Sequence, residues 1–261
     1  MASLERTAYP RFPRTLTLKD LQTSFTPTAE EIHWVNSKAR GAEMRAALGT
    51  LLKCFQYLHY FPSVESVPPE VVQHVCATLG LPQSSQITYW GNLTATMYRH
   101  HKAIRELLGV RTYDERHARK LVIQIALDAA AVVNTRTDLI NVAINELVRL
   151  GYELPAFRTL DDIAEKVHSA AEANLYVAIV HRLSASQRKW LDELLHGELP
   201  ARQTRYNQLK RSAKKSSRKH LDALIDQLQW LESLPDCDAM LADVPATKIK
   251  HMADMAAALD A

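Results

Sequence analysis

Apolar residues recur along this 261-residue chain at spacings of three and four, and this periodicity limits the fold more than any other feature. Such spacing gathers apolar side chains on one face of an α-helix, whereas a half-buried strand would alternate with a period of two. Four of the seven glycines stand where such a segment stops, as a left-handed helix C-cap requires: Gly80, Gly109, Gly151 and Gly197. The sequence therefore predicts an all-α protein made of consecutive small helical domains with helix-turn-helix-like elements.

The periodic segments define the expected helices. They cover residues 16–24, 28–37, 42–61, 69–79, 92–108, 113–133, 138–150, 160–182, 186–196, 206–211, 217–234 and 245 onward. Three helices begin with a capping box, in which two side chains bond each other's backbone amides: Thr28 with Glu31, Thr112 with Glu115, and Ser184 with Gln187. Segment 113–133 is apolar nearly all round, which predicts that it is the central buried helix of the first domain.

Two further helices carry a single apolar stripe. The stripe of 42–61 consists of Leu48, Leu51, Leu52, Phe55 and Leu58, and that of 217–234 consists of Leu221, Leu224, Ile225, Leu228 and Leu231. A length of 261 residues corresponds to about two domains of roughly 150 residues. We expect a helical domain over 1–155 with a basic arm at 1–15, a second helical domain over 156–235, and at 236–261 the start of a further, truncated helical segment.

The composition is that of an ordinary globular protein, with 47% hydrophobic and 23% charged residues. No apolar run reaches the roughly 18 residues of a membrane span, and residues 1–18 lack the apolar core of a secretory signal. We therefore expect no membrane partner and a cytoplasmic location. The three widely spaced cysteines, Cys54, Cys76 and Cys237, are expected to be buried thiols, not a disulfide framework or a zinc site.

Positive charge is concentrated in one internal segment. Residues 199–221 hold eight Lys or Arg and no acid, whereas the rest of the chain sums to −5 for a total of +3. A block of like charge repels itself, and a polyanion such as DNA relieves that repulsion. The centre of this segment leads into the helix predicted from Ser217, whose free amides and positive dipole end suit a phosphate.

A second basic group lies on the helix expected over 92–108. Arg99, Lys102 and Arg105 fall on one side of it, roughly opposite the apolar Met97, Ile104, Leu107 and Leu108. Such a helix can dock by its apolar face and present cations to a DNA groove or to phosphates, although a merely solvated face gives the same pattern.

Residues for catalysis form no recognised pattern. The sequence lacks a glycine-rich phosphate loop, a His-Glu-x-x-His zinc helix, a serine elbow and paired cysteines at metal spacing. His100 and His101 are neighbours, but they lie about 100° apart around a helix and do not share a metal. We therefore expect no enzymatic activity, no catalytic residue, no metal site and no cofactor.

The order of several short motifs resembles the N-terminal region of the large replicative transposases of the Tn-three type, which are bacterial class II elements. The motifs are Phe55-Gln56-Tyr57-Leu58 through Phe61-Pro62, Val67-Pro68-Pro69-Glu70-Val71-Val72, Leu79-Gly80-Leu81, then Tyr89, Thr96, His100, Ile104 and Arg105, Glu153-Leu154-Pro155 with Thr159-Leu160, Leu209-Lys210 with Ser217, and the tail 241–249 with Val244-Pro245-Ala246. Met97 and Tyr98 stand where relatives often have two arginines, which weakens the carry-over of base contacts from that helix. Ser212 and Ala213 stand where Gly-Pro is common, but this departure is offset by Lys214 and Lys215, which add charge that attracts phosphate.

The resemblance implies consecutive helical modules that recognise the terminal inverted repeats of a transposon. It also implies that the RNase H-like domain, with its Asp-Asp-Glu triad and two magnesium ions, lies beyond residue 261, so that magnesium serves only that missing domain. The implied location is the bacterial cytoplasm, at the nucleoid. The implied partners are duplex DNA and the full-length transposase.

Our hypothesis from the sequence is a non-catalytic, sequence-specific duplex DNA binder. Its expected contact residues are Thr96, Arg99, His100, Lys102, Arg105, Arg205, Lys210, Arg211, Lys214, Lys215, Ser217, Arg218 and Lys219. The alternative is a helical protein-interaction scaffold or regulatory fragment whose basic segment binds an acidic partner.

Overall fold

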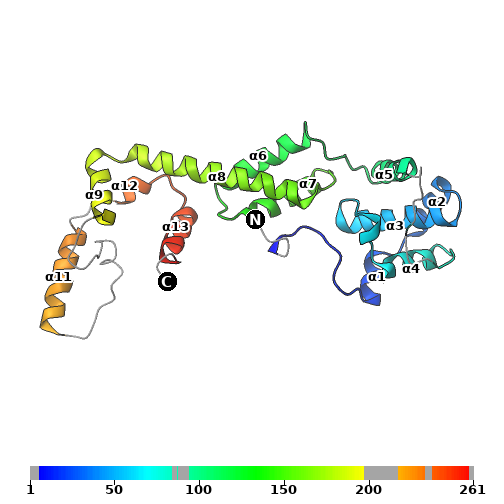
Figure 1. The fold of residues 1–261 in the computed structure, drawn as a ribbon, viewed down its shortest axis with the longest axis horizontal. Coiled ribbons are helices and arrows are strands. Elements are labelled where there is room, and N and C mark those ends of the chain that lie inside the picture. The colour runs from blue at the N-terminus through cyan, green and yellow to red at the C-terminus, as the bar shows by residue number, and fades with distance from the viewer. Residues whose placement is uncertain (1–5, 84–86, 88–93, 197–216, 233–236, 259–261) are drawn as a thin grey trace. The chain divides into compact units, whose positions relative to one another are not determined.

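The computed structural model describes residues 6–83, 87, 94–196, 217–232 and 237–258 of the chain (Figure 1). Apart from one 3-10 turn at Val64–Ser66, all regular structure in these ranges is α-helical and none of it is strand. The predicted all-α fold is confirmed. The chain divides into two compact units, Met1–His168 and Ser169–Ala261, while the domain limits expected at residues 155 and 235 stay predictions.

The helices follow the predicted periodic segments closely. The first unit contains α1 (Leu18–Ser24), α2 (Ala29–Lys38), α3 (Ala42–Leu58), α4 (Pro69–Thr78), α5 (Thr94–Leu108), α6 (Ala118–Ala130) and α7 (Arg136–Arg149). The long α8 (Phe157–Arg182) begins in the first unit, and α9 (Ala185–His196), α11 (Arg218–Glu232), α12 (Cys237–Leu241) and α13 (Ala246–Ala258) belong to the second. The helix expected over 206–211 lies outside the described residues.

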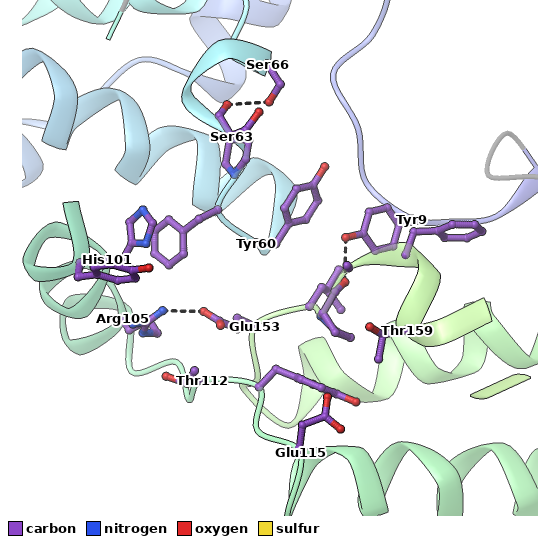
Figure 2. A pocket seen from close by; sticks show the side chains of 18 residues that line it. Tyr9, Tyr60, Ser63, Ser66, His101, Arg105, Thr112, Glu115, Glu153 and Thr159 are labelled. Atoms are coloured by element: carbon purple, nitrogen blue, oxygen red, sulfur yellow. Dashed lines mark hydrogen bonds and ion pairs between the residues drawn. The ribbon is translucent and has the colours of Figure 1, made fainter. Parts of the chain in front are cut away.

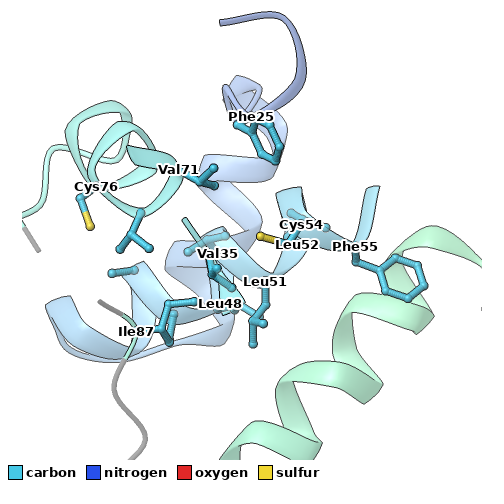
Figure 3. Packing of buried hydrophobic residues seen from close by; sticks show 14 of the residues in the cluster. Phe25, Val35, Leu48, Leu51, Leu52, Cys54, Phe55, Val71, Cys76 and Ile87 are labelled. Atoms are coloured by element: carbon cyan, nitrogen blue, oxygen red, sulfur yellow. The ribbon is translucent and has the colours of Figure 1, made fainter. Parts of the chain in front are cut away.

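The core of the first unit is built around α3. Its predicted stripe is confirmed, since Leu48, Leu51, Leu52, Phe55 and Leu58 are all buried. Leu48, Leu51, Leu52 and Phe55 share one buried cluster with Val35 of α2 and Val71 of α4, and α3 also contacts α5 (Figure 3). The helix ends at Leu58, three residues earlier than predicted, because His59 adopts a left-handed conformation with φ 59° and donates its amide to the Phe55 carbonyl.

Two of the three predicted core thiols are confirmed by this packing. Cys54 and Cys76 are buried members of the core cluster, while the Cys237 side chain lies outside the described residues. Burial raises the pKa of the Cys54 thiol to about 12, because the apolar core disfavours a thiolate.

The prediction that segment 113–133 forms the central buried helix is wrong. The helix there is the shorter α6, which packs on α7 and buries one row of residues at every fourth position, Ala118, Val122, Ala126 and Ala130. Leu127 and Val132, in contrast, are 45% and 64% exposed. A segment that is apolar all round does not show from its sequence which face is covered, and here the small side chains permit the close contact.

The predicted start of that helix is also wrong. Instead of a capping box between Thr112 and Glu115, a turn closes at Asp114, whose Oδ1 accepts from the amides of Arg116 at 2.9 Å and His117 at 2.6 Å. An aspartate that bonds the amides two and three residues ahead competes with a helix start at its own position. The helix therefore begins only at Ala118.

The other predicted helix ends agree with the structure. Thr28 and Glu31 bond each other's amides at the start of α2, and Ser184 and Gln187 do so at the start of α9. Gly80, Gly109 and Gly151 have φ values of 64°, 65° and 69°, as left-handed caps require, and Gly197 lies outside the described residues.

Candidate nucleic-acid interface

Helix α5 docks by one face and exposes the other. Ile104 is fully buried and His100 is 7% exposed, whereas Tyr98, Arg99, Lys102 and Glu106 are exposed at spacings of three and four. The predicted cations Arg99 and Lys102 therefore lie on a solvent-facing surface, with the aromatic ring of Tyr98 beside them in sequence.

These two cations make only weak local contacts. The Arg99 guanidinium donates to Oγ1 of Thr96 at 2.7 Å, so the two predicted contact residues already touch. The Lys102 ammonium lies 3.9 Å from a carboxylate oxygen of Glu106, and both side chains are mostly exposed. Exposed pairs of this kind contribute about 0–1 kcal/mol, so a phosphate can replace the carboxylate at small cost.

Arg105 occupies a different environment. Its guanidinium forms a 2.9 Å ion pair with Glu153, with side-chain exposures of 20% and 17%, and it lies over the Phe61 ring (Figure 2). Arg105 follows Arg99 by six residues, which places the two side chains about 120° apart around the helix axis. Arg105 is therefore turned away from the exposed face. The structure therefore gives Arg105 an internal role, in which it links α5 to the loop before α8.

A cavity of about 750 Å³ lies beside this ion pair, and its lining includes Tyr9, Tyr60, Phe61 and His101 (Figure 2). The His101 ring stacks on Phe61 with centroids 3.8 Å apart and planes 11° apart. Burial, followed by the positive charges of Arg105 and His100, lowers the pKa of His101 to about 4. The imidazole is therefore neutral near pH 7, where it packs as an aromatic ring.

His100, another predicted contact residue, points into the protein. Burial lowers its pKa, with a smaller contribution from the charge of Arg99. A buried neutral imidazole lies away from the exposed face of α5, on which Arg99 and Lys102 are found.

The residues after α5 add a cation that the sequence pattern did not single out. The exposed Arg111 stacks its guanidinium over the Tyr152 ring at 4.2 Å and donates to the Leu150 carbonyl at 2.8 Å. Arg111 and Lys102 both line a second open hollow, of about 700 Å³, together with Tyr98. The only sequence signal for Arg111 is a basic residue shortly after the Gly109 cap, because the Tyr152 partner is distant in sequence.

In the second unit, α11 begins where the basic segment ends. The Ser217 hydroxyl bonds Nδ1 of His220 at 2.6 Å and accepts from the His220 amide at 3.4 Å, so Ser217 caps the helix. Arg218 is exposed, and Lys219 lies in α11 with its side chain outside the described residues. The remaining predicted contacts also lie outside the described residues: Arg205, Lys210, Arg211, Lys214 and Lys215.

The described residues contain no group of three or more His, Cys, Asp or Glu side chains arranged to hold a metal ion. Within the same ranges, every helix is too short or too polar to cross a membrane.

A family model described as a domain of unknown function (DUF4158) matches residues 1–167. The matched range ends one residue before the first compact unit does, so the family model and the packing of the chain define nearly the same segment. A comparison with curated proteins gives no match.

Proposed function

This chain belongs to the family described as a domain of unknown function (DUF4158), and from that premise we propose that it binds duplex DNA. In this proposal it recognises the terminal inverted repeats of a transposon, as the N-terminal part of a replicative transposase. The resemblance of its motif order to Tn-three-type transposases supports the choice of DNA target.

The observation that carries the proposal is the segregation of charge. Eight cations and no acid occur over 199–221 in a chain whose other residues sum to −5. The described end of this segment is a helix start, capped by Ser217 and bearing the exposed Arg218. The helix dipole and a dense cationic segment together favour phosphate binding.

The exposed face of α5 gives independent support from the first unit. Arg99 and Lys102 are held there only by weak local contacts, and Arg111 is fixed nearby on the Tyr152 ring. We propose that these three cations contact the DNA backbone and that Arg105 instead positions α5 through Glu153.

Fluorescence anisotropy of the whole chain tests the proposal. The probe is a duplex carrying the terminal repeat of a Tn-three-type element, compared with a scrambled duplex of equal length over a salt series. Specific recognition exceeds non-specific binding by about 10³-fold or more. A repeat preference of that size supports end recognition, whereas equal binding to both duplexes contradicts it.

Single substitutions then assign the contacts. Each lost phosphate contact reduces the slope of log affinity against log salt by about 0.9, so Lys214→Ala, Lys102→Ala and Arg111→Ala should each reduce it by about one. Lys38→Ala, which removes the same charge from the exposed end of α2, is the matched control and should leave the slope unchanged.

The proposal assigns no chemical step to these residues. Bound alone at a transposon end, the chain would compete with the intact transposase for that site. Supercoiled plasmid incubated with the purified chain and magnesium should remain uncut, and cleavage would contradict the non-catalytic assignment.

One observation favours the alternative, a helical protein-interaction scaffold. Several large apolar side chains of α11 are exposed, and such surfaces mark protein contacts more often than DNA contacts. If neither duplex binds at any salt concentration, the scaffold becomes the better assignment.

A further inference from the structure

Helix α11 carries an apolar face that nothing in the described part of the chain covers fully. Leu221, Leu224, Ile225 and Leu228 are 58%, 38%, 43% and 56% exposed. Large apolar side chains grouped in this way on a surface mark a contact site.

The spacing of this face is that of a coiled-coil seam. Leu221, Leu224 and Leu228 follow one another at intervals of three and four, and Leu231 continues the same spacing in the sequence. These are successive a and d positions of a heptad. Ile225 then occupies the adjoining e position, together with the two residues seven positions before and after it, Arg218 and Glu232.

The charges beside the seam select the orientation of the partner. The exposed Arg218 lies at the N-terminal end of the e row and the exposed Glu232 at its C-terminal end, with the apolar Ile225 midway between them. In an antiparallel pair of identical helices, e positions face e positions of the other copy. Arg218 of each copy then faces Glu232 of the other, and Ile225 faces itself across the two-fold axis.

A parallel pair lacks this match, because e positions then face g positions of the second copy and Arg218 and Glu232 lie at opposite ends of the seam. We propose that α11 is a self-association surface that pairs antiparallel with α11 of a second copy of this chain. The proposal does not depend on DNA binding, although Arg218 belongs to both surfaces.

Sedimentation velocity of the whole chain without DNA tests the pairing. The wild-type sedimentation coefficient should rise with protein concentration from that of a monomer toward that of a dimer. Leu228→Glu places a charge in the seam and should remove this rise, while Asp222→Lys, on the outer side of the same helix, should leave it unchanged. A wild-type chain that remains monomeric over the whole range would overturn the proposal.

Charge exchange separates pairing with a second copy from other contacts. Arg218→Glu and Glu232→Arg should each weaken dimerisation by about tenfold or more, since like charges then face each other. The double variant R218E/E232R restores opposite charges in an antiparallel pair and should recover dimerisation. Failure of this recovery would exclude the antiparallel arrangement.

Cross-linking locates the symmetry axis. In a Cys237→Ser background the remaining cysteines, Cys54 and Cys76, are buried. Ile225→Cys should then join two copies through a short bismaleimide, whereas Asp222→Cys should not. If the wild-type chain stays monomeric and Leu228→Glu lowers the thermal midpoint, another part of the same chain covers the seam. That outcome would overturn the proposal.

Discussion

At the scale of single residues, two cations three positions apart on α5 have different roles. Lys102 is 76% exposed beside Glu106, whereas Arg105 is 20% exposed and pairs with Glu153, a residue distant in sequence. An exposed pair contributes little to stability, but loss of one partner from a partly buried pair leaves a charge without compensation. The residue type alone does not distinguish these two cases.

The half-buried His101 makes stability depend on pH. Its pKa is about 4 in the folded protein and near 6.5 in the unfolded chain, because burial disfavours the imidazolium. Between these values the unfolded chain binds more protons, so the contribution of His101 is fully present above about pH 6.5 and declines as the pH falls toward 4. The free energy of unfolding should therefore decrease with acidification through this window.

Urea denaturation of wild type and His101→Gln at several pH values between 7 and 4 measures this contribution. The unfolding free energy of the variant should depend less steeply on pH, because unfolding of the variant takes up as much as one proton fewer than unfolding of wild type. His33→Gln makes the same change at an exposed histidine of α2, where unfolding alters the surroundings little. Parallel curves for wild type and His101→Gln would refute the assignment.

At the scale of helices, the contact of α3 with α4 depends on one glycine. Gly49 lies buried in α3, and a Cβ atom there would lie 2.9 Å from Cδ1 of Leu79 and 3.3 Å from Cγ1 of Val75. The Leu79 side chain can move aside, but the branched Val75 is held in the core. The absence of a side chain at Gly49 therefore sets how closely the two segments approach.

Gly49→Val should reduce the free energy of unfolding by about 1–3 kcal/mol or more, because its branched side chain overpacks this contact. Gly49→Ala is the graded control, since one methyl group is smaller and alanine favours a helix by about 1 kcal/mol over glycine. Urea midpoints of the two variants measure the difference. Equal midpoints for Gly49→Val and wild type would show that the contact is loose.

At the scale of the whole molecule, the first compact unit and the family match coincide. Residues 1–168 contain the α3-centred core, the α6–α7 pair and the contacts that join them, such as the Tyr9 hydroxyl bond to the Pro155 carbonyl at 2.9 Å. A unit with its own core is expected to fold alone.

A fragment of residues 1–168 should therefore unfold in one cooperative transition, with a thermal midpoint within a few degrees of the corresponding transition of the whole chain. Circular dichroism and calorimetry provide the measurement. A fragment without a cooperative transition would show that the first unit requires residues 169–261.

The sequence by itself determined the local structure of this protein. Periodic apolar residues predicted the helices, Thr28 and Ser184 predicted two of their starts, and Gly80, Gly109 and Gly151 predicted three of their ends. These features depend on residues within one or two helical turns of each other, and such interactions are present in the local sequence.

Only the tertiary structure decided which faces are covered. It placed the centre of the first unit at α3 instead of α6, paired Arg105 with Glu153, fixed Arg111 on Tyr152 and left the seam of α11 exposed. Each of these outcomes depends on a partner distant in sequence or on the absence of one. Periodicity fixes the direction of a side chain around its own helix, whereas the environment it meets there is set by how the helices pack.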